Sequence, residues 1–179
     1  MTLIAVWGTA YMHNFSCSDL TTIHETAVLT DYRDGEEYNV ALLADGKCWM
    51  TQNLRLGITA IGDSITLDST YSNISSGTFT MTNIIDDTTS ETWATDGTTT
   101  SHAFIDTDND AYGGLYNWYT ATAGTTITSS SSTDSSNSIC PYGWRLPTGT
   151  SSGEYGAMLY AEGILASATG NGYASGASI

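Results

Sequence analysis

Two Asp-Gly dipeptides constrain the fold most, because they divide one stretch of the chain into three short runs of alternating character. They are Asp34-Gly35 and Asp45-Gly46. Asp-Gly tolerates the positive φ angles of a type I′ turn, which joins adjacent antiparallel strands. The three strands are expected within residues 28–33, 36–44 and 47–53. Alternate positions of the middle strand share one face of a sheet, so its core-facing side chains are expected to be Tyr38, Val40 and Leu42. The sequence therefore predicts a three-stranded meander.

Further along the chain, residues 64–68 and 77–82 also alternate and predict two more strands among polar loops. A helix is expected after the second proline, where Ser151 and Glu154 have the spacing of a capping box. Gly170 is expected to end this helix. The apolar residues that follow at helical spacing are Tyr155, Met158, Leu159 and Leu165.

The charge of the chain excludes one class of partner. Nineteen acidic residues face four basic ones, and the formal net charge is -15. Binding to phosphate backbones requires clustered basic residues, so nucleic acid is not an expected partner. No apolar run reaches the roughly 18 residues of a spanning helix, so membrane insertion within this chain is not expected either. Abundant Ser and Thr with a single lysine are typical of secreted or cell-surface β-rich proteins.

Three sequence blocks together carry a resemblance. They are residues 45–54 (DGKCWMTQNL), 112–118 (YGGLYNW) and 140–148 (CPYGWRLPT). In this order they resemble the Fibrobacter succinogenes major paralogous domain family, a set of exported bacterial domains, over roughly Thr9 to Leu165. The third block is also similar to a stretch of C-type-lectin-like domains and of formylglycine-generating enzymes. The resemblance implies an α+β, C-type-lectin-like fold with irregular antiparallel sheets, long loops and one or two short helices.

The same resemblance suggests how the chain is organised. Residues 1–8 are interpreted as a leader or strand remnant, and residues 9–179 as a single lectin-like domain. A Ser/Thr-rich excursion at 125–138 has too little apolar surface to offset chain entropy and is expected to be flexible. Family members usually continue to a further cysteine near the terminus, so this chain is expected to lack its C-terminal part.

The residues of the three blocks are expected to be mainly structural. Tryptophans bury a large apolar area and offer an indole donor to a nearby carbonyl. Proline and glycine fix or free the backbone where extended segments and close approaches need it. The structural motif residues are Trp49, Asn53, Tyr112, Gly113, Trp118, Cys140, Pro141, Gly143, Trp144, Leu146 and Pro147.

One acidic segment has the pattern of a cation site. Asp106, Asp108 and Asp110 alternate, and such carboxylates can surround a calcium ion. The EF-hand pattern fails, because Ala111 stands where glycine is required and Asn117 stands at the twelfth position. A solvated acidic loop is the alternative. Calcium is the one cofactor that the sequence suggests.

The three cysteines leave two interpretations. In an exported protein Cys17 and Cys48 are expected to form a disulfide, with Cys140 left for a partner beyond the C-terminus. Three unpaired, buried thiols are the alternative.

These observations favour a noncatalytic bacterial module, extracellular or at the cell surface, that binds a glycan or a surface protein. Tyr71, Phe79 and Trp93 lie in polar surroundings and are candidate ligand contacts, although aromatics that cap the core are an equal alternative. No nucleophile–base pair or zinc-like histidine spacing is present, so no catalytic residue is assigned. The rival hypotheses are a purely structural unit of a larger surface protein and a divergent enzyme of the formylglycine-generating fold.

Overall fold

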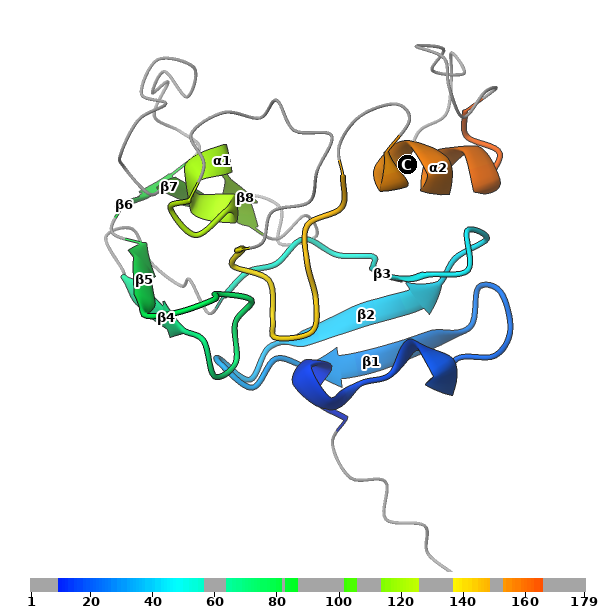
Figure 1. The fold of residues 1–179 in the computed structure, drawn as a ribbon, viewed down its shortest axis with the longest axis horizontal. Coiled ribbons are helices and arrows are strands. Elements are labelled where there is room, and N and C mark those ends of the chain that lie inside the picture. Colours follow the sequence, from blue (N-terminus) through cyan, green and yellow to red (C-terminus); the bar gives the residue numbers. More distant parts are fainter. Residues whose placement is uncertain are drawn as a thin grey trace, which may run out of the picture.

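The computed structural model describes residues 10–56, 64–81, 83–86, 102–105, 114–125, 137–148 and 153–165. Its elements in chain order are the 3-10 helices η1 (Met12–Asn14) and η2 (Cys17–Asp19), the strands β1 (Thr26–Thr30), β2 (Glu37–Leu42), β3 (Cys48–Met50), β4 (Ile65–Asp68), β5 (Thr78–Met81), β6 (Asn83–Asp86), β7 (His102–Ile105) and β8 (Gly114–Tyr116), and the helices α1 (Trp118–Ala121) and α2 (Glu154–Ala161). Sheets with two short helices confirm the expected α+β class (Figure 1).

The predicted meander is confirmed. Strands β1, β2 and β3 form one antiparallel sheet in chain order, with Val28 opposite Asn39 and Ala41 opposite Trp49. The expected inner face of β2 is buried, since Tyr38, Val40 and Leu42 are 2%, 0% and 8% exposed.

The turns of the meander differ from the predicted type I′. Gly35 and Gly46 have φ angles of 82° and 78°, whereas neither preceding aspartate has a positive φ. Between β2 and β3, Gly46 N donates to Leu43 O (2.9 Å) and Leu43 N donates to Lys47 O (2.9 Å). This is a three-residue loop that needs a left-handed residue only at its last position. The dipeptides therefore marked the turns correctly but not their type.

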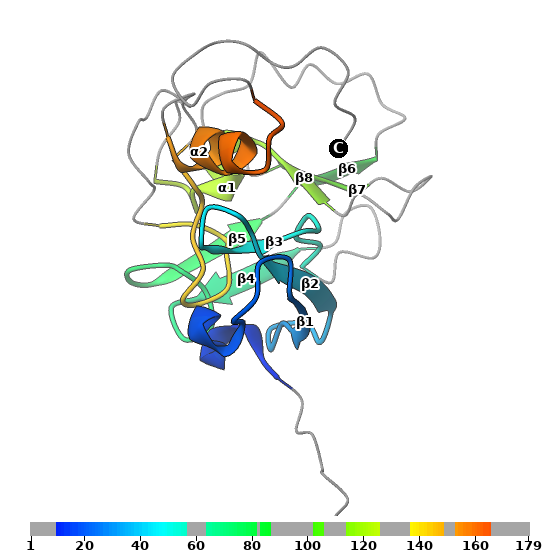
Figure 2. The same cartoon turned by 90° about the vertical axis from the view of Figure 1, so that its right-hand side faces the viewer.

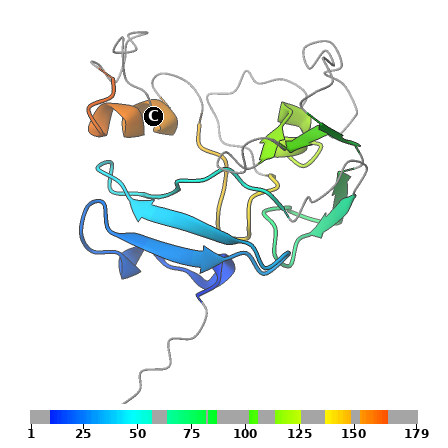
Figure 3. The same cartoon turned by 180° about the vertical axis from the view of Figure 1, so that it is seen from behind.

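The remaining described strands form two further sheets. The predicted strands near 64–68 and 77–82 exist as β4 and β5, which pair with each other antiparallel. The third sheet, β6-β7-β8, was not predicted, and it corrects the expectation of antiparallel sheets because β6 pairs with β7 in parallel. Figures 1 and 3 show β8 and α1 toward one end of the meander and α2 toward the other.

Helix α2 lies over β3 in two perpendicular views (Figures 1 and 2). Met158, Leu159 and Leu165 are buried as expected, and they pack with Leu43 and Trp49 of the meander. At the other end of the helix, the carboxylate of Glu162 accepts a hydrogen bond from Ala44 N at 2.7 Å. The helix is therefore fixed to the β2–β3 loop by apolar contacts and by one charged acceptor.

The ends of α2 differ from the prediction. Its N-cap is Gly153, so Glu154 is the first helical residue and the expected capping box with Ser151 is wrong. Thr148 takes that role across a longer loop, because its hydroxyl accepts from Glu154 N at 2.7 Å and its N–H donates to Glu154 Oε2 at 3.3 Å. The helix ends at Ala161 rather than near Gly170. Tyr155, expected on the apolar face, is 40% exposed.

The described side chains form three apolar clusters. The first joins β4 and β5 to residues 54–56, 123 and 139, and the second lies between the meander and η1. The third is the contact of α2 with the meander. No helix among these described segments is both long and apolar enough to cross a membrane.

A buried arginine joins three parts of the chain. The Arg33 guanidinium bonds both carboxylate oxygens of Asp31, and their side chains are 7% and 2% exposed. The same group donates to Ser72 Oγ at 3.1 Å and to Ile139 O at 2.6 Å. The β1–β2 loop is thus bonded to the segment after β4 and to the segment of residues 137–148.

We expect Arg33→Met to lower the free energy of unfolding by about 3–5 kcal/mol, because Asp31 is then left buried without its cation. Arg145→Met is the matched control. Arg145 also pairs with a carboxylate, but its side chain is 43% exposed, so its loss is expected to cost about 1 kcal/mol or less. Urea unfolding of both variants measures the difference, and equal losses contradict the interpretation.

Candidate functional site

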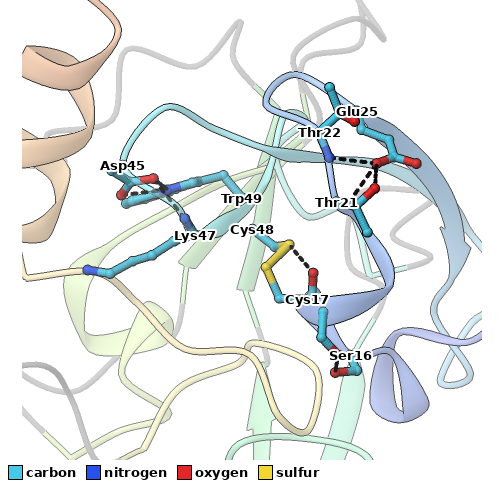
Figure 4. The surroundings of a disulfide bond; sticks show 10 residues. Ser16, Cys17, Thr21, Thr22, Glu25, Asp45, Lys47, Cys48 and Trp49 are labelled. Carbon is cyan, nitrogen blue, oxygen red and sulfur yellow. Dashed lines mark hydrogen bonds between the residues drawn. A yellow bond between two sulfur atoms is a disulfide. The ribbon is translucent and has the colours of Figure 1, made fainter.

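A disulfide joins the N-terminal segment to the meander. Cys17 of η2 and Cys48 of β3 are bonded at a sequence separation of 31, which confirms the predicted pair (Figure 4). Cys140 is a free cysteine. Burial raises the pKa of its thiol, so it is protonated at neutral pH. A nucleophilic role for this thiol is therefore disfavoured.

Two tryptophans of the sequence blocks lie beside this disulfide and use their indole N–H groups to hold the scaffold. Trp144 Nε1 donates to Met12 O at 3.0 Å. Trp49 Nε1 donates to the Asp45 carboxylate at 3.1 and 3.2 Å (Figure 4). The Trp144 ring stacks on Phe15 with centroids 6.2 Å apart and planes 15° apart. These contacts fit the expected structural role.

The same tryptophans also line a hollow surface. A groove of about 280 Å³ is lined by Phe15, by the disulfide, by Gly46 and Lys47 of the β2–β3 loop, and by Gly143 and Trp144. It adjoins a second hollow of about 180 Å³ with which it shares Lys47, Cys48, Gly143 and Trp144. The second hollow adds Trp49, Arg145, Pro147 and Glu154. We call the two together the disulfide groove.

Three ionised groups meet at one end of the disulfide groove. The Glu154 carboxylate accepts from Lys47 Nζ at 3.0 Å and from Arg145 at 2.5 and 2.6 Å. Figure 4 shows Lys47 extending away from the disulfide, toward the segment that carries residues 137–148. The hydrogen bonds from Arg145, together with those from Lys47 and from Thr148 N, lower the pKa of Glu154 to about 2 despite its partial burial.

A carboxylate with so low a pKa is ionised at neutral pH and is a weak general base. The arrangement can bind polar and charged groups of a ligand, and aromatic faces lie beside them. It does not resemble a nucleophile activated by a base.

We expect Glu154→Gln to lower the free energy of unfolding at neutral pH by about 1 kcal/mol, since the ion pairs are partly exposed to solvent. The folded-state pKa is depressed, so this contribution is present above about pH 4.5 and is lost as the pH falls toward about 2. Urea unfolding of wild type and variant at several pH values measures it. A stability difference that stays constant down to pH 2 contradicts the assignment.

Two of the three candidate ligand contacts predicted from sequence, Tyr71 and Phe79, do not line the disulfide groove. The Tyr71 ring lies 4.4 Å from that of Tyr32 and 5.2 Å from that of His13. Phe79 packs against the core cluster of β4 and β5 and contacts Tyr119 edge to face at 6.2 Å, which is the core-capping alternative. Trp93 lies outside the described residues.

The predicted calcium ligands Asp106, Asp108 and Asp110 lie outside the described residues, and so do Tyr112 and Gly113, residues 1–8 and most of the 125–138 excursion. The calcium site therefore stays a prediction. Within the described segments, no group of three or more His, Cys, Asp or Glu side chains is placed to hold a metal ion.

The remaining block residues divide between core and surface. Pro141 is fully buried, whereas Asn53 is exposed. Trp118 is half-buried at the start of α1, and its indole nitrogen is buried with no hydrogen-bond acceptor among the described residues. Leu146 and Pro147 are half-buried where the chain approaches α2.

Comparison with known proteins gives the family of the chain. The model of the Fibrobacter succinogenes major domain matches residues 44–151, which is more than half of the 179 residues, and the chain belongs to this family. The match is narrower than the resemblance from Thr9 to Leu165. It includes Lys47, Trp144 and Arg145 but not Phe15 or Glu154. No curated protein and no solved structure matches the chain.

Sequence reasoning missed four residues of the disulfide groove: Phe15, Lys47, Arg145 and Glu154. One signal was present, because two of the only four basic residues in the chain fall within the sequence blocks. Scarce cations in recognisable blocks of an acidic chain point to a local requirement for positive charge.

The disulfide holds one wall of the groove, since Phe15 lies only two residues before Cys17. We expect its removal in a Cys17→Ser, Cys48→Ser double variant to lower the free energy of unfolding by about 3–4 kcal/mol for a loop of this length. Cys140→Ser is the control and is expected to change stability less. Thermal unfolding of the three proteins measures the effect, and a double variant as stable as wild type contradicts it.

Proposed function

We propose that the chain is a noncatalytic, extracytoplasmic bacterial surface module that binds a glycan or a protein through the disulfide groove. The observation that carries this proposal is the composition of the groove walls. Aromatic faces of Phe15 and Trp144 lie beside a Lys47–Glu154–Arg145 ion-pair cluster, and the two sides come from segments far apart in the sequence. Apolar surface combined with a few convergent polar groups is typical of ligand sites.

Two further features support the extracytoplasmic part of the proposal. The chain has a Cys17–Cys48 disulfide. Disulfides persist in oxidising compartments and are rare in cytosolic proteins. The acidic composition with a single lysine is typical of exported proteins. The C-type-lectin-like arrangement suggested by the Gly143-Trp144-Arg145-Leu146-Pro147 segment is part of the same proposal.

A binding role is favoured over catalysis because, within the part of the chain that the structure describes, Glu154 supplies the one carboxylate that lines the groove. It forms hydrogen bonds to two cations and has a pKa of about 2. It neither takes up a proton readily at neutral pH nor activates a neighbouring nucleophile. The charged cluster is therefore suited to orient a ligand.

The test is a binding screen of the folded chain against an array of cell-wall and cell-surface polysaccharides and a set of purified surface proteins. We expect at least one ligand, and we expect Lys47→Glu and Phe15→Ser each to weaken its binding by about tenfold or more, which corresponds to the loss of one good contact. Tyr160→Ala is the control, because Tyr160 is 49% exposed on α2 and does not line the groove.

Two results contradict the proposal. One is a screen without any ligand, which favours a purely structural unit. The other is a ligand whose affinity changes with Tyr160→Ala but not with the two groove variants.

A further inference from the structure

One carboxylate beside Arg33 has a buried oxygen without a partner. Asp34 lies in the β1–β2 loop, directly after Arg33. Its Oδ1 accepts a hydrogen bond from Glu36 N at 2.9 Å. Its Oδ2 is buried and has no hydrogen-bond partner among the described residues. Burial without a hydrogen bond removes the hydration of a charged carboxylate and therefore disfavours its ionisation.

The cation next to Asp34 bonds other groups. Nε and Nη2 of Arg33 donate to the carboxylate of Asp31, and Nη1 donates to Ser72 Oγ and to Ile139 O. We call Arg33 with these three partners the Arg33 junction. Each nitrogen of the guanidinium is thus already a donor to another group. In the part of the chain that the structure describes, one cation lies beside two carboxylates and bonds only one of them.

The groups that interact electrostatically with Asp34 come from its own loop and from two strands. They are Asp31, Arg33 and Glu36 of the loop, Tyr38 of β2 and Tyr116 of β8. Burial raises the pKa of Asp34 to about 6, in opposition to the hydrogen bond from Glu36 N. Repulsion from Asp31 acts in the same direction as burial and exceeds the attraction to Arg33. Burial also raises the pKa of both tyrosines, so these phenols are neutral and the second negative charge is left without compensation.

We propose that Asp34 is a proton-binding site that strengthens the Arg33 junction in mildly acidic solution. Protonation removes the negative charge that competes with Asp31, so the guanidinium then faces one carboxylate instead of two. The three segments that converge on Arg33 are held most firmly when Asp34 is neutral. This inference concerns the scaffold, and it goes beyond the proposed function because it does not depend on any ligand of the groove.

The direction of the pH effect follows from the burial of Asp34. The usual pKa of an aspartate is 3.8, and the folded-state value is about 6, so the folded protein binds this proton more tightly than the unfolded chain does. The stabilisation by Asp34 is therefore complete below about pH 4 and is lost as the pH rises through about 6. Hydrogen bonds lower the pKa of Glu25, Glu154 and Glu162. Their contributions have the opposite sign and are lost only below about pH 4.5, outside the range of Asp34.

The first experiment follows the Asp34 carboxyl group of the full chain by carbon-13 NMR between about pH 4 and about pH 8. We expect a titration midpoint near pH 6. The amide of Glu36, which donates to Asp34 Oδ1, is expected to shift with the same midpoint. This measurement uses the wild-type chain and does not depend on the folding of a variant.

The second experiment compares urea unfolding of wild type, Asp34→Asn and Glu37→Gln at about pH 7.5 and about pH 5. Between these pH values, we expect the unfolding constant of wild type to fall about tenfold more than that of Asp34→Asn, because asparagine takes up no proton. Glu37→Gln is the matched control, since Glu37 begins β2 close by and is exposed, and it is expected to keep the wild-type pH dependence. Histidines also change charge in this range, and the comparison between variants cancels their contribution.

Three results overturn the inference. They are an Asp34 carboxyl group that titrates near about pH 4, an Asp34→Asn variant that keeps the wild-type pH dependence, and a Glu37→Gln variant that loses it to the same extent as Asp34→Asn. None of these measurements involves a ligand, so the proposed function is tested separately.

Discussion

The structure depends on one buried charge, the guanidinium of Arg33. It pairs with Asp31 in the loop that follows β1 and bonds the carbonyl of Ile139, more than a hundred residues further along the chain. The guanidinium also donates a hydrogen bond to the hydroxyl of Ser72. A buried cation is tolerated only when its donors are satisfied. The chain therefore folds so that three segments converge on this side chain, and this convergence brings residues 137–148 to the meander.

The disulfide groove follows from that convergence. Two further interactions stabilise the chain close to the groove. Trp144 Nε1 donates a hydrogen bond to Met12 O, and the disulfide joins η2 to β3. The arrangement also has a cost. Burial, which outweighs the hydrogen bond from Glu36 N, raises the pKa of Asp34 to about 6, and one of its carboxylate oxygens is buried without a partner among the described residues. The residues of the family blocks thus build the scaffold and line the groove at the same time.

The sequence predicted the local features and the Cys17–Cys48 disulfide, and it missed the contacts that form the groove. Alternation in residues 36–44 and the Asp-Gly dipeptides were sufficient for the meander, because pairing between neighbouring strands depends on short-range signals. The capping-box rule pairs Glu154 with the residue three positions before it, so the sequence assigned the cap to Ser151. In the structure, Thr148 instead accepts the hydrogen bond from Glu154 N. The groove was missed because Lys47 and Glu154 lie 107 positions apart, and no periodicity relates them.

Hydrogen exchange of the Arg33→Met variant tests the central claim most directly, namely that this one side chain holds the 137–148 segment together with residues 71–73 at the β1–β2 loop. The reporters are the amides of Ser138 and Tyr142, which bond Asn73 O and Tyr71 O. Our account predicts that these amides lose protection while the β1–β2 amides keep theirs. Unchanged protection at Ser138 and Tyr142 in the variant contradicts it.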